Sequence, residues 1–421
     1  MSTTAMSRYS SLLFGSSFAA SAQRTKRLTV SFRPALAHVM DGLVSHGCLV
    51  VDLTDGGTNF DIAGKTSSMW ETVSKFFTTL DESPEKETLL SPMESIEASP
   101  FAKLGYANYQ NGVKFLETRL DRKQNTVLPA DIHSIIGSDG SEQLQQSFEA
   151  LAEVGKAVVR IATAASSWES KGFPSGMDAP SISGVSFGRG NEAGIDSGTD
   201  DDAGDPESAI KASIAATRMV RELVDDGTVL DANIMEGDVS MSPHRFCYYT
   251  NGADENSESS TNAKEVFGGH TDSSFVTMIP VAAVAGFEVF DESAAKWYRP
   301  ELRALDHWRE EQVKKGGDPN SLVDLVGIRE LPWHARYVVI IPGEYLQIVS
   351  RNEIESAVHR VVATSKARLS APVLLRGRPG VKIDVPRYLG STNHGLLEEV
   401  NGMVMEDLHN EMQDIQEALQ K

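Results

Sequence analysis

The sequence has little cysteine and no long apolar run. Among its 421 residues only Cys48 and Cys247 are cysteines, which limits the chain to one disulfide and excludes a cysteine-based metal site. We expect both to be buried free thiols in a reducing compartment. No apolar run approaches the roughly 20 residues that a membrane-spanning helix needs, so no membrane span is expected.

Acidic residues are absent from the first 40 positions, although the whole chain holds 59 of them and has a net charge of −20. Basic residues such as Arg24, Lys26 and Arg27 stand there among many serines and alanines, a composition typical of a transit peptide. Residues 1–27 are therefore a flexible leader of a cytoplasmic protein, the interpretation we favour, or a transit peptide for a plastid or mitochondrion. The acidic charge repels phosphate backbones, so nucleic acid is not an expected partner.

Hydrophobic periodicity divides the remaining chain into regions. Residues 28–245 predict a helical and mixed N-terminal region, interrupted at about 170–207 by an acidic, glycine- and serine-rich flexible insert. Residues 246–390 predict a β-rich core with an insert at about 302–331, and 391–421 predict an amphipathic C-terminal helix. Further helices are predicted over 34–46, 62–80, 141–168 and 208–226. Residues 85–140 give few predictions.

Two short patterns in the β-rich region indicate a chemical site. His270 and Asp272 stand two residues apart, as do Arg368 and Ser370, and residues i and i+2 of a strand point to one face. If His359 faces the same interior, two imidazoles and one carboxylate meet on one side of a metal ion. That ligand set leaves open positions and suits non-heme Fe(II) that activates oxygen. Arg368 would then bind a carboxylate, with the Ser370 hydroxyl as a second donor.

The His-x-Asp pattern is weak when it is taken alone. The chain contains two His-x-Asp/Glu matches, about what chance predicts from 10 histidines and 59 acidic residues. Alone, His270 and Asp272 would be read as an ion pair at a strand end, and Arg368 as a surface residue. The order of the motifs along the chain strengthens the metal-site interpretation. An apolar run follows Asp272, His359 lies in a strand-like run, and Arg368 follows nine residues after His359.

In this order the motifs resemble those of the plant-type 2-oxoglutarate/Fe(II) dioxygenases, the group that includes isopenicillin N synthase. The resemblance covers the C-terminal half of the family pattern. The matching segments are His270-Thr-Asp272, Gly286-Phe-Glu-Val289, Gly343-Glu-Tyr-Leu-Gln347, His359-Arg-Val361 and Arg368-Leu-Ser370. Cys247 departs from the pattern, because many relatives have asparagine there.

The resemblance implies a mainly β fold with α elements (α+β), in which a double-stranded β-helix, or jelly roll, is flanked by N-terminal and C-terminal helices. It implies that iron binds His270, Asp272 and His359. It implies that 2-oxoglutarate binds Arg368, Ser370 and Tyr249, although Tyr249 is equally well explained as a core aromatic residue.

The expected function is that of a non-heme Fe(II), 2-oxoglutarate-dependent dioxygenase. It would use molecular oxygen to hydroxylate or desaturate a small organic substrate, with succinate and CO2 as coproducts and ascorbate as an optional further cofactor. Two alternatives stay open: an oxidase of the same fold that does not use 2-oxoglutarate, and a jelly-roll binding protein without turnover. Neither the substrate nor the oligomeric state follows from the sequence.

Overall fold

The computed structural model describes residues 30–31, 36–53, 61–97, 99–109, 112–167, 206–230, 237–250, 265–292, 294–326, 329–389 and 399–419. The predicted leader and most of the predicted acidic insert lie outside these residues. The helices are α2 (Leu36–His46), α3 (Ile62–Glu82), α4 (Pro84–Glu87), α5 (Ala130–Ser167), α6 (Pro206–Leu223), α7 (Pro300–Lys315), η1 (Trp333–Arg336), α8 (Glu344–Val349), α9 (Val385–Leu389) and α11 (Met405–Leu419). The strands before the core are β1 (Val30–Ser31), β2 (Leu49–Asp52), β3 (Glu94–Ile96), β4 (Ser99–Tyr109), β5 (Val113–Leu120) and β6 (Thr126–Val127). Those that follow are β7 (His244–Tyr249), β8 (Glu265–His270), β9 (Val276–Pro280), β10 (Phe287–Asp291), β11 (Lys296–Tyr298), β12 (Val323–Val326), β13 (Arg329–Pro332), β14 (Tyr337–Pro342), β15 (His359–Val362), β16 (Arg368–Ser370) and β17 (Val373–Leu375).

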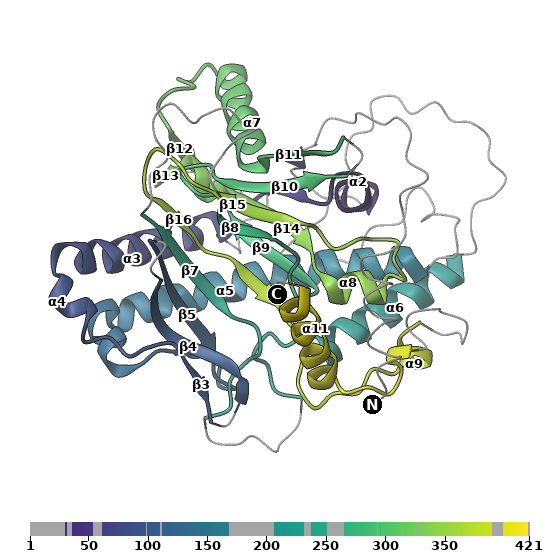
Figure 1. Cartoon of the computed structure of the whole chain (residues 1–421). Helices are drawn as coiled ribbons and strands as arrows, with labels where there is room; N and C mark the ends of the chain where they lie inside the picture. The colour runs from purple at the N-terminus through teal and green to yellow at the C-terminus, as the bar shows by residue number, and fades with distance from the viewer. Residues whose placement is uncertain are drawn as a thin grey trace.

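Two antiparallel sheets form the centre of the molecule (Figure 1). The larger sheet has β14-β9-β17-β7 at its middle, with β16 also paired to β7, and the smaller sheet has the order β11-β10-β15-β8. From β7 to β17 the chain passes back and forth between these sheets, and each pairing among these strands is antiparallel. This topology is a jelly roll. The expected fold class, mainly β with α elements around a double-stranded β-helix, is therefore confirmed.

Strand β14 shows how the sequence makes a two-sided layer. Alternate side chains of a strand point to opposite faces. Val338 and Ile340 pack in the apolar cluster between the larger sheet and the helices, whereas Val339 and Ile341 pack in the cluster between the two sheets. All four are fully buried, so the larger sheet has an apolar environment on both faces here.

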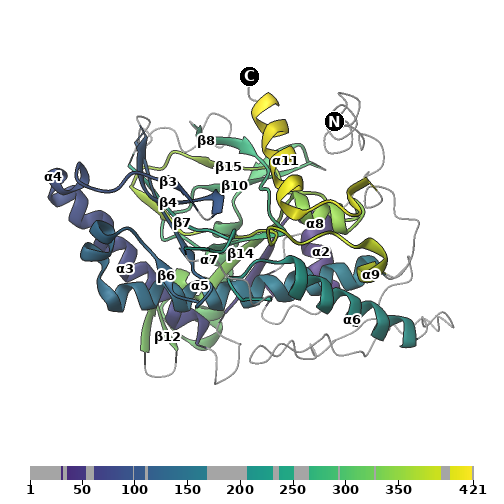
Figure 2. The same cartoon turned by 90° about the horizontal axis from the view of Figure 1, so that it is seen from below.

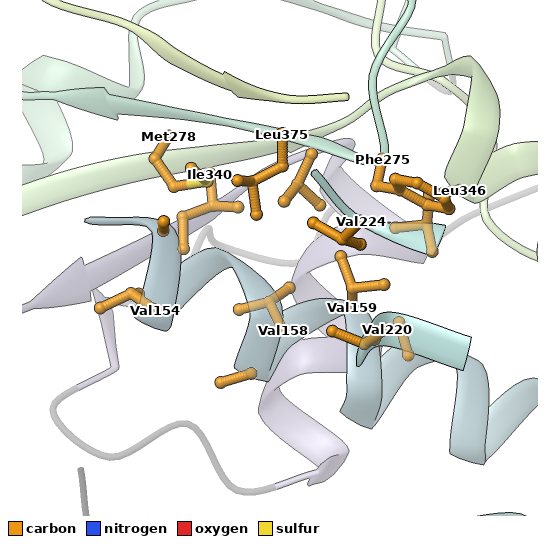
Figure 3. Packing of buried hydrophobic residues seen from close by; sticks show 14 of the residues in the cluster. Val154, Val158, Val159, Val220, Val224, Phe275, Met278, Ile340, Leu346 and Leu375 are labelled. Atoms are coloured by element: carbon orange, nitrogen blue, oxygen red, sulfur yellow. The ribbon is translucent and has the colours of Figure 1, made fainter. Parts of the chain in front are cut away.

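Helices α5, α6 and α3 cover the outer face of the larger sheet, and the smaller sheet lies on its other side (Figure 2). Val154 and Val158 of α5 point toward Met278, Ile340 and Leu375 of the sheet (Figure 3). The helix approaches closely because α5 has glycine at position 155. A Cβ there would collide with the Met278 sulfur and lie 2.7 Å from the Leu375 Cδ1.

The N-terminal half extends the larger sheet at both edges. Strands β1 and β2 add next to β14, and the antiparallel strands β5, β4 and β3 add next to β7. The second addition falls in the stretch 85–140, where periodicity gave few predictions. It matters for the site because β5 carries Glu117 directly opposite Arg245 of β7.

The C-terminal helix begins later than the amphipathic pattern suggests. α11 starts at Met405, because Val404 pairs with Lys382 in a β-bridge and Gly402 turns the chain with a φ of 84°. Its predicted apolar stripe is a core face: Met405, Leu408 and Met412 are buried in the cluster shared with the sheet and α5. No helix among the described residues has the length and apolar character needed to cross a bilayer.

Candidate metal centre

Three predicted metal ligands meet at one point inside the jelly roll. β8 ends at His270, β15 begins at His359, and these two residues are direct partners across the antiparallel pair. Asp272 follows two residues after His270. Its carboxylate oxygens lie 3.7 Å from the Nε2 of His270 and 3.7 Å from the Nε2 of His359. One donor atom from each residue lies within 4.8 Å of the other two, an arrangement that fits a single metal ion.

Hydrogen bonds to neighbouring groups orient all three ligands. The Nδ1 of His270 lies 2.9 Å from the carbonyl oxygen of Gly268, and the Nδ1 of His359 lies 3.0 Å from that of Ala357. A carbonyl only accepts, so each Nδ1 carries the proton and each Nε2 keeps a lone pair directed at the centre. Thr277 donates its hydroxyl to Asp272 at 2.6 Å. Such partners fix the tautomer and orientation of metal ligands.

The electrostatics keep the ligands in their metal-binding protonation states. Burial, and to a smaller extent the neighbouring His359, lower the pKa of His270 to about 4. Burial alone would raise the pKa of Asp272, but the two imidazoles and the Thr277 hydrogen bond outweigh it and the pKa is lowered. At neutral pH the centre therefore offers a neutral imidazole at His270 and a carboxylate at Asp272, as metal binding requires. Within the described residues, no other group of three His, Cys, Asp or Glu side chains comes close enough to hold an ion.

The predicted cosubstrate residues lie together near the C-terminal end of β7, where β16 pairs with it. β16 pairs with β7 so that Arg368 lies opposite Tyr249 and Ser370 lies opposite Cys247. The Arg368 guanidinium is fully buried, with its carbon 5.6 Å from the centre of the Tyr249 ring. Its Nη2 donates to Glu301 at 2.9 Å, whereas its Nε and Nη1 are buried without a hydrogen-bond partner among the described residues. Two unsatisfied donors of a buried cation are what an incoming carboxylate needs.

Glu301 is a part of this site that the sequence reasoning missed. It stands in the first turn of α7, just before the segment expected to be an insert, and is 1% exposed. Its carboxylate accepts hydrogen bonds from the backbone N–H groups of Gly286 and Phe287 and from Arg368. Gly286 also leaves room for the arginine, because a Cβ there would lie 2.9 Å from the Arg368 Cδ. The only sequence signal is an acidic residue after Pro300, which is common at helix starts.

Both cysteines are buried free thiols, as expected. Burial raises the pKa of Cys247 to about 11, so this residue presents a neutral S–H beside Ser370. Burial likewise raises the pKa of Cys48 to about 12, and its sulfur lies 3.2 Å from the hydroxyl of Tyr298. Cys247 therefore supplies neither a thiolate ligand nor the amide found at this position in many members of the family that the motifs resemble.

No family model and no curated protein matches the sequence. Among solved structures the chain is similar to a full-length Neurospora crassa protein in complex with alpha-KG, with 14% identity, a TM-score of 0.47, and 87% of this chain and 89% of that chain covered. It is also similar to the dioxygenase for auxin oxidation of rice, with 15% identity, a TM-score of 0.42, and coverage of 89% and 88%. The corresponding Arabidopsis thaliana enzyme, a binary complex with 2-oxoglutarate, gives 14% identity, a TM-score of 0.42, and coverage of 83% and 90%. Likenesses this distant assign no function to this chain, and the plant-type assignment stays a prediction.

Proposed function

We propose that this chain is a non-heme Fe(II), 2-oxoglutarate-dependent dioxygenase that hydroxylates or desaturates a small organic substrate, with succinate and CO2 as coproducts. The observation that carries the proposal is the convergence of His270, Asp272 and His359 inside a jelly roll. Two imidazoles and one carboxylate on one side of an ion form the facial triad of non-heme Fe(II) oxygenases. When bound, Fe(II) would supply the activation of molecular oxygen.

Each remaining residue of the site has a binding role in this proposal. Arg368 would hold the distal carboxylate of 2-oxoglutarate through its unpaired Nε and Nη1, and Ser370 and Tyr249 would complete that end of the pocket. The walls between this end and the triad include Phe287, whose ring centre lies 5.5 Å from that of His359. An apolar lining of this kind strengthens charged hydrogen bonds and limits the access of water to the reacting groups.

The Arg368–Glu301 pair favours a second candidate, an oxidase of the same fold that does not use 2-oxoglutarate. Because Glu301 already provides one negative charge, the guanidinium attracts a further carboxylate less strongly than a free arginine would. Affinity for 2-oxoglutarate, measured on the metal-loaded protein, separates the two candidates.

The test is metal and cosubstrate binding followed by turnover. Under anaerobic conditions the intact chain should bind one Fe(II) and then 2-oxoglutarate, as measured by calorimetric titration, and with oxygen it should release succinate. His359→Ala and Asp272→Ala should each weaken Fe(II) binding more than about 100-fold, since even partners of the ligands contribute 10- to 100-fold. His133→Ala, which removes an exposed histidine of α5, is the matched control and should change neither quantity. An intact chain that binds Fe(II) no better than His359→Ala would overturn the proposal.

A further inference from the structure

A second basic group lies at the opposite end of β7 from Tyr249. Arg245, Cys247 and Tyr249 share one face of the strand, and Cys247 and Tyr249 belong to the cluster between the two sheets. The side chain of Arg245 is therefore directed toward the interior. Tyr249 is four residue steps along the strand from Arg245, which is about 13 Å.

Arg376 joins this group from the end of β17. Leu374 is the partner of Thr277, whose hydroxyl binds Asp272, and Arg376 is two residues further along on the same face. The chain is held there because Phe275 donates its N–H to the carbonyl of Leu375 at 2.8 Å. Arg376 thus stands on the metal side of the interior. Its Nε is buried without a hydrogen-bond partner, and its guanidinium forms no ion pair with any described acidic residue.

The charges in this cluster do not balance. Glu117 accepts two hydrogen bonds from Arg245, at 2.8 and 2.6 Å, and one from Arg119 at 2.6 Å. Arg119 and Arg245 therefore share one carboxylate, and Arg376 adds a third guanidinium that forms no ion pair with a described acidic residue. This excess of positive charge occurs in a chain with 59 acidic and only 39 basic residues. Arg245 and Arg376 are half-buried, so an anion can reach them, and a partly buried cation without a counterion favours anion binding.

The anion is not the cosubstrate of the proposed function. 2-Oxoglutarate has two carboxylates, of which one would reach the metal and the other Arg368. Arg368 lies opposite Tyr249, and Arg245 lies on the far end of the same strand. The separation of Arg245 from Tyr249 along β7 therefore leaves Arg245 and its neighbour Arg376 without a role in holding 2-oxoglutarate.

We propose that the primary substrate is an organic acid whose carboxylate binds Arg376 and Arg245 beside the metal centre. This inference rests on the proposed function and adds the chemical class of its substrate. Arg376 is the main anchor because its guanidinium forms no ion pair within the described part of the chain, and Arg245 is the second because Glu117 already binds it. The interior thus has two positively charged binding positions for two acids: the cosubstrate would bind at Arg368 and the substrate at Arg376.

The test compares carboxylic acids with their own primary amides, which have nearly the same shape and no charge. The probes are acetate, hexanoate, benzoate and phenylacetate with acetamide, hexanamide, benzamide and phenylacetamide. Each is titrated calorimetrically into the anaerobic protein loaded with Mn(II) and 2-oxoglutarate. At least one acid should bind about 10- to 100-fold more tightly than its amide, the difference expected for hydrogen bonds to a charged group.

Variants then locate the acid. Arg376→Gln should lower the affinity for that acid about 10- to 100-fold and leave 2-oxoglutarate binding unchanged, which also shows that the variant is folded. Arg376→Lys should restore part of the affinity. Arg387→Gln, which removes an exposed positive charge bound to Glu222, controls for net charge and should have no effect.

Either of two results would overturn the inference. In the first, the protein binds no acid in the set more tightly than the corresponding amide. In the second, Arg376→Gln keeps the full preference for the acid while it still binds 2-oxoglutarate. The proposed function fails separately. A protein that binds the acids at Arg376 but takes up neither Mn(II) nor 2-oxoglutarate would contradict the dioxygenase and leave the anion site standing.

Discussion

The buried pair between Arg368 and Glu301 allows one substitution to test both stability and cosubstrate binding. Glu301→Gln removes a negative charge from a position where both partners are fully buried and 2.9 Å apart. The arginine then keeps a buried charge without a counterion, and four backbone or side-chain donors face an amide instead of a carboxylate. Breaking a buried pair by removing one partner costs roughly 3–5 kcal/mol, so the free energy of unfolding should fall by that amount.

The same substitution should strengthen 2-oxoglutarate binding. In the native chain, Glu301 occupies one edge of the guanidinium, and the proposed cosubstrate carboxylate would occupy another. Two carboxylates about 6 Å apart repel by roughly 3 kcal/mol at an effective dielectric constant of about 20. Removing this repulsion should make 2-oxoglutarate bind about 100-fold more tightly to Glu301→Gln. The variant should therefore be less stable when free and more strongly stabilised by its ligand.

Urea titration followed by circular dichroism measures the first effect, and anaerobic calorimetry on the Mn(II)-loaded protein measures the second. Glu311→Gln is the matched control, since it makes the same change on the same helix in a pair with Lys314 and Lys315, which are exposed. It should change the unfolding free energy by no more than about 1 kcal/mol. If Glu301→Gln is as stable as Glu311→Gln, the buried pair is refuted. If it binds 2-oxoglutarate more weakly than the native chain, Arg368 is not the cosubstrate anchor.

Three further predictions follow from contacts described above. Thr277→Val should weaken Fe(II) binding about 10-fold in metal titrations, because Asp272 loses an orienting hydrogen bond; unchanged affinity would deny Thr277 that role. Burial lowers the pKa of His244 to about 3, below its unfolded value, so the unfolded chain binds the extra proton and stability is lost as pH falls from about 6.5 toward 3. His244→Phe should remove up to about 1.4 kcal/mol per pH unit from that loss, as urea titrations at pH 6.5 and 4.5 would show; an equal loss in both proteins would contradict it. Gly155→Ala should cost about 1–3 kcal/mol of unfolding free energy, because its Cβ collides with Met278; a variant of native stability would mean that the helix can shift.

The two residue pairs of the candidate site were predictable because they obey local rules. His270 and Asp272 are two residues apart at a strand end, and Arg368 and Ser370 alternate within one strand, so their shared faces follow from backbone geometry. The jelly roll was predictable only through the resemblance of the ordered motifs to a family. The pairing of β7, β9, β14 and β17 joins segments far apart in the chain, and no local pattern specifies it.

Glu301 could not be predicted, since its partner Arg368 is 67 residues away and the contact depends on how α7 packs against the smaller sheet. Arg245 and Arg376 gave no signal either, because an isolated arginine near a strand end is usually exposed. The hairpin of β4 and β5 was predictable in principle. Asn111-Gly112 stands between Tyr109 and Val113, and Asn-Gly flanked by strand-forming residues is a strong hairpin signal.

The two interior sulfhydryls give this molecule a reporter of its own opening. A thiol with a raised pKa and no access to solvent reacts with an alkylating reagent only after the surrounding structure separates. Cys48 precedes β2 and Cys247 lies in β7, and strands β14, β9 and β17 separate these two strands in the larger sheet. The alkylation rate of each cysteine, resolved by mass spectrometry, would therefore measure how often the structure around β2 and around β7 opens, without any introduced label.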